Sequence, residues 1–374
     1  MRRRGFAVIL CLAILCILTS RLGTLPKLSA QNQSSLYRVL QPVQSGNLTI
    51  FPVVRASGNA KTANWQYITL DEGLKNGEII VTEKGRMQGL VRTGHAGVWY
   101  PPQSGGEVNQ LVLINNSSKP LILLAGEIVT GGKQDRVVAK DRIVPPQSDP
   151  VDLSVFCIEP GRWVTTSEQF GGAGKGNMSF MVQPAVRQEA MVAQDQQRVW
   201  SAVGGAISNM SAAAPSSQGS ATTSYAKTMQ EDTVAQKVDE AGQTLLQSRE
   251  QILAKLREEH AVGVVAAIRG EIVWADIFAD PDMLAKYWTK LVRSYAAEVL
   301  TAEWHQNAHA TQEDAQRFLD EDISGRETSD GDAGIYRYSE TRAGNIVTFV
   351  LRSLLPGANF DVHISKLRKR AGDY

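Results

Sequence analysis

Two short polar motifs interrupt the apolar runs in the first half of the chain, and their residue types could perform chemistry. The first, AGEIVTGGKQDR, spans residues 125–136. Its Glu127 could act as a general acid or base if burial raised the pKa of the carboxyl group. Lys133, Gln134 and Arg136 could bind an anionic group, the arginine through two parallel hydrogen bonds. The motif therefore predicts a site for an anionic small molecule or polymer.

Three glycines in this motif are expected to shape its backbone. Gly126 comes directly before Glu127, and the pair Gly131 and Gly132 comes before Lys133. Glycine allows tight turns and lets the backbone approach a ligand closely. We therefore expect the three glycines to form the loop that presents the polar side chains.

The second motif, FCIEPGRW at residues 156–163, offers a thiol, a carboxylate, a cation and an aromatic ring. Cys157 could be a nucleophile if basic neighbours lowered its pKa, although a free cysteine between two apolar residues is more often packed as a small hydrophobe. Glu159 could transfer protons, and Arg162 could bind negative charge. Trp163 could stack on a ligand, but a buried anchor is the more common role of tryptophan.

The same charged residues also allow a purely structural interpretation. Glu127 and Arg136 could pair with each other across a strand-turn-strand unit, and a buried ion-pair network imitates a functional site. The sequence therefore leaves two hypotheses open. One is a hydrolytic or binding site for an anionic ligand, and the other is a non-catalytic structural or interaction module.

Together the two motifs resemble those of the bacterial ARG and Rhodanese-Phosphatase-superfamily-associated protein domain family. The resemblance extends over most of the chain after residue 30, including the later GEIVWADIF. It implies no particular reaction, since the family name refers to associated proteins and states no chemistry. The matching positions are Gly126, Glu127, Gly132, Lys133, Gln134, Arg136, Cys157, Glu159, Arg162 and Trp163.

The elements that must position these motifs are short strands. Residues 121–124 form an apolar run before the first motif, and residues 151–155 alternate before the second. Another strand is expected at residues 48–55, and Asn, Gly and Pro turns separate such runs up to residue 163. The first half is therefore predicted to be β-rich.

The second half mixes helices with further strands, so we expect an α+β fold. Apolar residues between 234 and 256 make one stripe of a long amphipathic helix. A hairpin is expected at residues 262–278, followed by a helix over residues 282–303 that Asp280 and Pro281 introduce. Residues 329–332 (SDGD) predict a turn.

Four segments divide the chain in our interpretation. Residues 1–30 read as a signal peptide, because three arginines precede a short apolar run without acidic residues. This predicts a secreted or periplasmic protein, with an uncleaved membrane anchor as the alternative. Residues 31–165 form the β-rich half, 166–230 a glycine-rich loop, helix and flexible linker, and 231–374 the mixed half, which packs on the same core.

The composition excludes some classes of protein. Loss of residues 1–30 removes five basic and no acidic residues, which changes the net charge from +1 to −4 and argues against a nucleic-acid binder. Cys157 is then the only cysteine, so no internal disulfide is expected. No cofactor is evident. His305 and His309 have the spacing of a helical metal pair but lack a third ligand, so we predict no metal site. The protein partners and the reaction class are left open.

Overall fold

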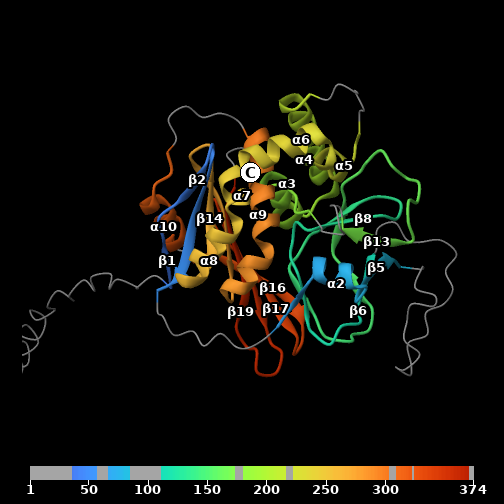
Figure 1. Cartoon of the computed structure of the whole chain (residues 1–374). Coiled ribbons are helices and arrows are strands. Elements are labelled where there is room, and N and C mark those ends of the chain that lie inside the picture. Colours follow the sequence, from blue (N-terminus) through green and yellow to red (C-terminus); the bar gives the residue numbers. More distant parts are fainter. Residues whose placement is uncertain are drawn as a thin grey trace, which may run out of the picture. The chain divides into compact units, whose positions relative to one another are not determined.

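Helices and strands both contribute heavily to this chain, which confirms the predicted α+β class. The computed structural model describes residues 36–56, 66–84, 111–172, 180–215, 222–302, 309–321 and 324–369 (Figure 1). The expected signal peptide and most of the glycine-rich loop lie outside these residues. Leu36–Tyr374 forms one compact unit. The segment boundaries expected near residues 165 and 230 stay predictions.

The largest sheet combines strands from both ends of the described chain. Its neighbouring strands are antiparallel, and all eight residues of its strand β14 are buried. The strand predicted at residues 48–55 and the hairpin predicted at 262–278 are confirmed as β3 and as β14–β15. The strand order is β1 (Tyr37–Val39), β3 (Leu48–Arg55), β14 (Ala261–Ile268), β15 (Glu271–Phe278), β19 (Asp361–Arg368), β18 (Ile346–Ser353), β17 (Tyr336–Ala343) and β16 (Arg326–Asp332), and β2 (Val43–Ser45) also pairs with β3.

Two smaller sheets contain the polar motifs. The strand expected at residues 151–155 is in fact two strands, because pairing changes partner at Ser154. The seven-stranded sheet has the order β11 (Val151–Leu153), β6 (Leu111–Asn115), β5 (Ile79–Glu83), β13 (Gln169–Gly172), β8 (Ile128–Thr130), β9 (Arg136–Val138) and β12 (Val155–Cys157). The three-stranded sheet has the order β10 (Arg142–Val144), β7 (Leu121–Leu123) and β4 (Ile68–Thr69).

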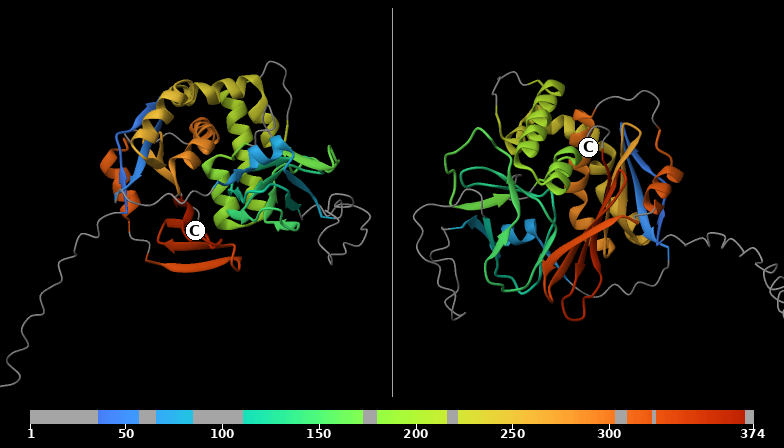
Figure 2. Two further views of the ribbon diagram at one scale, coloured as in Figure 1. Left: turned by 60° about the horizontal axis from the view of Figure 1, so that its bottom comes forward. Right: turned by 180° about the vertical axis from the view of Figure 1, so that it is seen from behind.

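Helices lie against the largest sheet, where α8 and α9 pack over β14 (Figures 1 and 2). Asp280 caps α9 by accepting a hydrogen bond from the Met283 amide, as predicted. The single helix expected between residues 234 and 256 is wrong, since the chain breaks at Gly242 and Ser248. The helices are α2 (Leu70–Asn76), α3 (Pro184–Gln188), the π-helical turn η2 (Glu189–Ala193), α4 (Gln196–Ala213), α5 (Tyr225–Gln230), α6 (Asp232–Ala241), α7 (Gln243–Gln247), α8 (Arg249–Glu258), α9 (Pro281–Thr301) and α10 (Gln312–Asp320).

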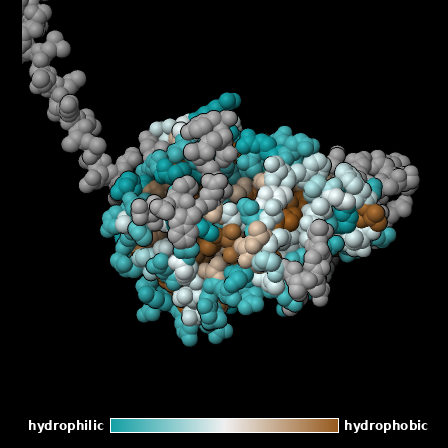
Figure 3. All heavy atoms as spheres, turned by 90° about the horizontal axis from the view of Figure 1, so that it is seen from above, coloured by the Kyte–Doolittle hydropathy of each residue, from teal (hydrophilic) through white to brown (hydrophobic). Residues whose placement is uncertain are grey.

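The apolar core joins the motif-bearing strands to the largest sheet. One cluster of buried residues contains Ile122, Leu124 and Ile128 together with Trp288 of α9 and Phe349 of β18. Burial of such side chains contributes about 1.5–3 kcal/mol each. The face in Figure 3 is mainly hydrophilic, with a smaller group of apolar residues near its middle. Because the strands around the motifs share this core with α9 and β18, the loops that carry the motifs are anchored on a packed framework.

Candidate functional site

Glu127 lies between β7 and β8 and forms an ion pair with Lys290 of α9. Its carboxylate is fully buried and also accepts a hydrogen bond from the Leu124 amide at 2.8 Å. Burial raises the pKa of Glu127. Burial opposes the charge of Lys290, but Glu127 and Asp71 outweigh it and raise the pKa of the lysine. Lys290 Nζ lies 3.0 Å from Asp71, so one helical lysine joins two carboxylates of the β-rich segment.

The glycine loop after β8 does bind carboxylates through its backbone, and those carboxylates belong to the chain itself. The amide of Gly131 donates to Asp135 Oδ1 at 3.1 Å, and the amide of Lys133 donates to Glu83 Oε1 at 3.0 Å. The amide of Asp135 donates to Glu159 Oε2 at 3.4 Å. Backbone amides gathered in a tight loop favour anions. Here three internal carboxylates fill that role.

Arg162 joins the second motif to the first. Its Nε lies 2.6 Å from Glu159 Oε2, and its Nη2 lies 3.0 Å from Asp135 Oδ1. Its Nη1 donates to the carbonyl oxygen of Gly132 at 2.8 Å. The structure therefore brings Glu159 and Arg162 to the loop of the first motif, whereas Glu127 belongs to a separate pair with Lys290.

Gln134 and Arg136 are fully buried next to this cluster. The Nη1 of Arg136 donates to the carbonyl of Gln134 at 2.5 Å, and burial lowers the pKa of its guanidinium. Burial raises the pKa of the Cys157 thiol, against the opposite effect of Arg136, and only 5% of the residue is exposed. Such a thiol is a weak nucleophile. Trp163 lies on the surface with 57% of its area exposed.

A second polar cluster, which the motifs do not predict, is centred on Asp276 of β15. Arg187 of α3 donates to both oxygens of this carboxylate, at 2.9 and 3.0 Å. The hydroxyl of Ser365 donates to it at 2.8 Å, and the hydroxyl of Tyr295 donates as well. Burial alone would raise the pKa of Asp276, but Arg187 and His363 hold it far below its usual range.

His363 connects Asp276 to a second buried carboxylate. Its Nδ1 lies 2.6 Å from Asp141 Oδ2, and its Nε2 lies 3.1 Å from Asp276 Oδ1. Burial opposes the charge on the imidazole, but Asp141 and then Asp276 outweigh it and raise the pKa of His363 to about 9. His363 is therefore an imidazolium at neutral pH. The other oxygen of Asp141 accepts a hydrogen bond from the Ala125 amide at 2.7 Å.

Strand geometry explains why these residues meet. Asp276 lies opposite Ser365 in the β15–β19 pairing, and His363 is two residues earlier on the same face of β19. Asp141 reaches this face from the turn between β9 and β10. One feature of the sequence could have indicated this cluster. The strand IVWADIF carries one carboxylate, that of Asp276, among apolar residues, and a buried charge requires a partner.

A cavity of about 210 Å³ lies beside Asp141. Lys140 and Arg142 also line it, and two aspartates of β16 face them across the space. Lys140 Nζ lies 2.5 Å from Asp330, and Arg142 Nη2 lies 2.7 Å from Asp332. The turn predicted at residues 329–332 is wrong, because these residues belong to strand β16. Asp141 is thus among the residues around the cavity, while its carboxylate has no exposed area and belongs to the buried cluster directly behind the wall.

No metal-ligand cluster and no membrane-spanning helix is found among the described residues. They contain no group of three or more His, Cys, Asp or Glu side chains arranged to hold a metal ion. His309 is described and exposed, whereas His305 lies outside the described residues. Within the ranges the structure covers, no helix is both long and apolar enough to cross a membrane.

Comparison with known proteins identifies one family. The family model described as ARG and Rhodanese-Phosphatase-superfamily-associated Protein domain (ARPP-1) matches residues 36–365. This match confirms the resemblance that the two motifs indicate. No curated protein and no solved structure matches the chain.

Proposed function

Because this chain belongs to the ARG and Rhodanese-Phosphatase-superfamily-associated Protein domain family, whose name states no reaction, we propose a function from the geometry of the Asp141 cavity. We infer that the protein hydrolyses a small anionic ester there. The observation that carries this proposal is the position of Asp141, a cavity residue whose carboxylate lies buried just behind the wall and pairs with His363, so that a ligand reaches it once the wall opens. A carboxylate fixed in this way can transfer protons to a bound molecule.

The charges around the cavity support an anionic ligand. Arg187 balances Asp276, and the imidazolium of His363 balances Asp141, so these four buried groups sum to zero. Lys140 and Arg142 contribute two positive charges to the cavity wall, which Asp330 and Asp332 balance until a ligand displaces these aspartates. An anion between them would be attracted by both, and Arg142 could bind it through two hydrogen bonds.

The aspartates that face these cations are suitable for displacement. The side chains of Asp330 and Asp332 are 52% and 40% exposed and those of Lys140 and Arg142 are 30% and 20% exposed, so solvent reaches and partly screens both ion pairs. Such exposed pairs contribute about 0–1 kcal/mol. An incoming anion can therefore replace Asp330 and Asp332 at small cost, since both aspartates become hydrated when they separate from the cations.

Asp141 and His363 together supply the proton that a leaving group needs. In the proposed step, water attacks the electrophilic atom of the ester, which is phosphorus in a phosphate ester, while the bond from that atom to the leaving oxygen breaks. His363 Nδ1 passes its proton to Asp141 Oδ2 over 2.6 Å, and Asp141 then gives a proton to the leaving oxygen. The proton released by the attacking water restores the imidazolium. Removal of such general-acid help lowers rates by about 10²–10⁴-fold.

Binding and turnover can be tested separately. Inorganic phosphate serves as the binding probe in calorimetric titrations, and phenyl phosphate serves as the substrate because phenolate leaves poorly without a proton. We expect Lys140→Gln with Arg142→Gln to weaken phosphate binding at least about tenfold. We expect Asp141→Asn to retain phosphate binding but to lose about 100-fold or more in phosphate release.

The matched control is Arg257→Gln, which breaks the exposed ion pair with Asp282 and leaves the cavity untouched. This variant should bind phosphate and release it as the wild-type protein does. Equal phosphate binding by the wild-type protein and the Lys140→Gln, Arg142→Gln variant would contradict the proposed anion site. Undiminished turnover by Asp141→Asn would contradict the proton-transfer role.

From the sequence we expect an anionic ligand and export from the cytoplasm, and we retain both as proposals, with the ligand at a different place. An anionic ligand at Lys133, Gln134 and Arg136 would have to displace Glu83 and other carboxylates of the chain from the loop. At the Asp141 cavity the carboxylates to be displaced, Asp330 and Asp332, are exposed to solvent, so we place the ligand there.

We also propose export on the basis of residues 1–30. Fractionation of cells that express the full chain tests it, and recovery only in the cytosol would refute it.

A further inference from the structure

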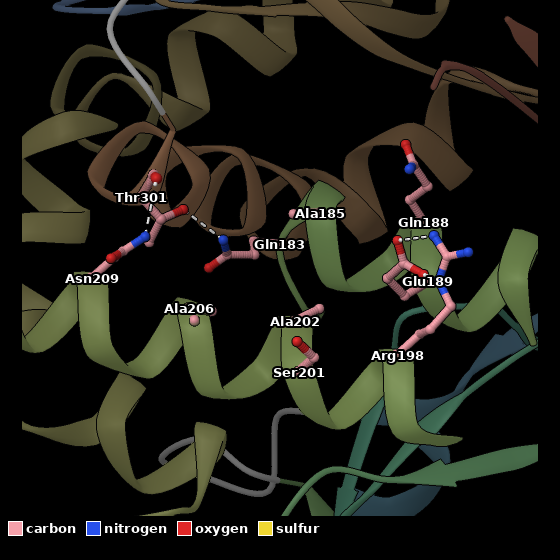
Figure 4. A pocket seen from close by; sticks show the side chains of 11 residues that line it. Gln183, Ala185, Gln188, Glu189, Arg198, Ser201, Ala202, Ala206, Asn209 and Thr301 are labelled. Carbon is pink, nitrogen blue, oxygen red and sulfur yellow. Dashed lines mark hydrogen bonds and ion pairs between the residues drawn. The ribbon is translucent and has the colours of Figure 1, made fainter. Parts of the chain in front are cut away.

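A second cavity of about 380 Å³ lies between α4, the segment around α3, and the C-terminal end of α9. Figure 4 shows α4 as one wall, with Gln183 and Ala185 on the opposite side and Thr301 near one end. Its volume is within the range of ligand-binding pockets. The cavity has no residue in common with the Asp141 cavity, and nothing argued for it depends on the proposed hydrolysis.

One face of α4 forms the floor of this groove. The lining positions run from Arg198 to Asn209 at spacings of three and four residues, as one helical face requires. With a rise of 1.5 Å per residue, this face is about 16 Å long. Its central residues are Ala202, Gly205 and Ala206. Because these side chains are so small, a bound chain could approach the helix closely.

Gln183 provides an unused hydrogen-bond acceptor in this groove. Only 1% of the residue is exposed, and its Nε2 donates to Thr301 Oγ1 at 2.6 Å. Its Oε1 is buried and has no hydrogen-bond partner among the described residues. A buried acceptor without a partner costs about 1–3 kcal/mol. A ligand that donates an N–H group to Gln183 Oε1 would remove that cost.

The charge of the groove favours a neutral ligand. Among the described residues that line it, Arg198 is the only cationic one, and its Nε lies 2.7 Å from the carboxylate of Glu189, which also lines the groove. The remaining polar lining groups are amides and hydroxyls, such as Asn209 and Ser201. Amide side chains both donate and accept hydrogen bonds, as a peptide main chain does. None of the lining residues that the structure describes is aromatic, so they offer no flat ring on which a sugar would stack.

We propose that this groove binds a short, extended, uncharged peptide segment with small side chains. The peptide lies along α4 over Gly205, and one of its main-chain amides donates to Gln183 Oε1. Asn209 and Ser201 contribute further hydrogen bonds to the peptide. At about 3.3 Å per extended residue, a 16 Å groove accommodates about five residues.

Two neighbouring glycines allow a closely matched test. A Cβ added at Gly204 or Gly205 would meet no atom within 4 Å, and both residues lie exposed in α4. Gly205 lines the groove, whereas Gly204 is turned about 100° away around the helix. Gly205→Leu therefore fills the groove, and Gly204→Leu has the same effect on helix propensity without filling it.

The probe is an N-acetylated, C-amidated pentapeptide of alanine, and its binding is followed by saturation-transfer NMR with the full chain. We expect wild-type protein and Gly204→Leu to bind it alike and Gly205→Leu to weaken binding at least about tenfold. Gln183→Met keeps the shape but removes the acceptor, and should weaken binding about fivefold. Equal binding by Gly204→Leu and Gly205→Leu would overturn the proposal. So would failure of the wild-type protein to bind the peptide at millimolar concentration, or a preference for maltotriose at the same groove.

Discussion

Replacement of Lys290 by methionine tests whether the first motif is held in place by a buried charge. Lys290→Met keeps the length and apolar character of the side chain but removes its ammonium group. Glu127 would then remain fully buried, with the Leu124 amide as a hydrogen-bond donor at 2.8 Å but without Lys290. Asp71 is 24% exposed in its side chain and can be hydrated, so Glu127 bears most of the penalty.

The expected loss in the free energy of unfolding is about 3–5 kcal/mol, the usual effect of removing one partner from a buried ion pair. Lys286→Met is the matched control, because Lys286 lies one turn earlier in α9 and pairs with Glu72 at the surface. The two side chains of that pair are 34% and 41% exposed, so its loss should cost at most about 1 kcal/mol.

Urea unfolding followed by tryptophan fluorescence measures both variants. The double variant Lys290→Met, Glu127→Gln should recover part of the loss, since the stranded charge is gone. Burial raises the pKa of Glu127, so the penalty should also shrink as pH falls and the carboxyl group is protonated. A loss for Lys290→Met no larger than that for Lys286→Met would refute this account of the motif.

Three further predictions concern other parts of the molecule. The pKa of His363 is raised from 6.5 to about 9, so its stabilisation of about 3 kcal/mol should be complete below pH 6.5 and lost by about pH 9, and His363→Gln should flatten this dependence in urea unfolding. Cys157 should react with a thiol reagent only when the chain unfolds, which absorbance in increasing urea will show, whereas rapid reaction of the folded protein would contradict its burial. Gly131→Ala should cost more than about 1 kcal/mol, because φ is +144° and an added Cβ would lie 2.5 Å from Ser167 Oγ. Gly204→Ala, with open space around it, should instead stabilise by about 0.4–1 kcal/mol, and calorimetric unfolding compares the two.

Local patterns predicted many of the elements correctly. The apolar run before the first motif is strand β7, and the helix expected over residues 282–303 is α9, Pro281–Thr301. Both predictions rest on neighbouring residues, such as the Asp280 cap and the apolar spacing behind it. Where a local signal was weak, the prediction failed. Strand β16 is almost entirely exposed and polar, so its sequence reads as a turn, and only pairing with β17 makes it a strand.

The candidate site was harder to predict because it depends on contacts between distant residues. Asp141 and His363 are 222 positions apart, and Arg187 and Asp276 are 89 positions apart. No periodicity or spacing in one sequence shows which buried charges will meet. The motif residues were identified as polar residues next to a core, but Glu127 pairs with Lys290 and not with Arg136. Lys290 belongs to α9, and the apolar stripe of this helix gave no sign that one of its lysines pairs with a buried carboxylate.

The central claim is that His363 and Asp141 hold a proton between them, directly behind the wall of the cavity. NMR titration of the His363 imidazole in the full chain tests this claim most directly. We expect a pKa of about 9 in the wild-type protein and a clear decrease in Asp141→Asn, because Asp141 is the main group that holds the proton on the ring. A pKa near 6.5 that Asp141→Asn leaves unchanged would contradict the claim.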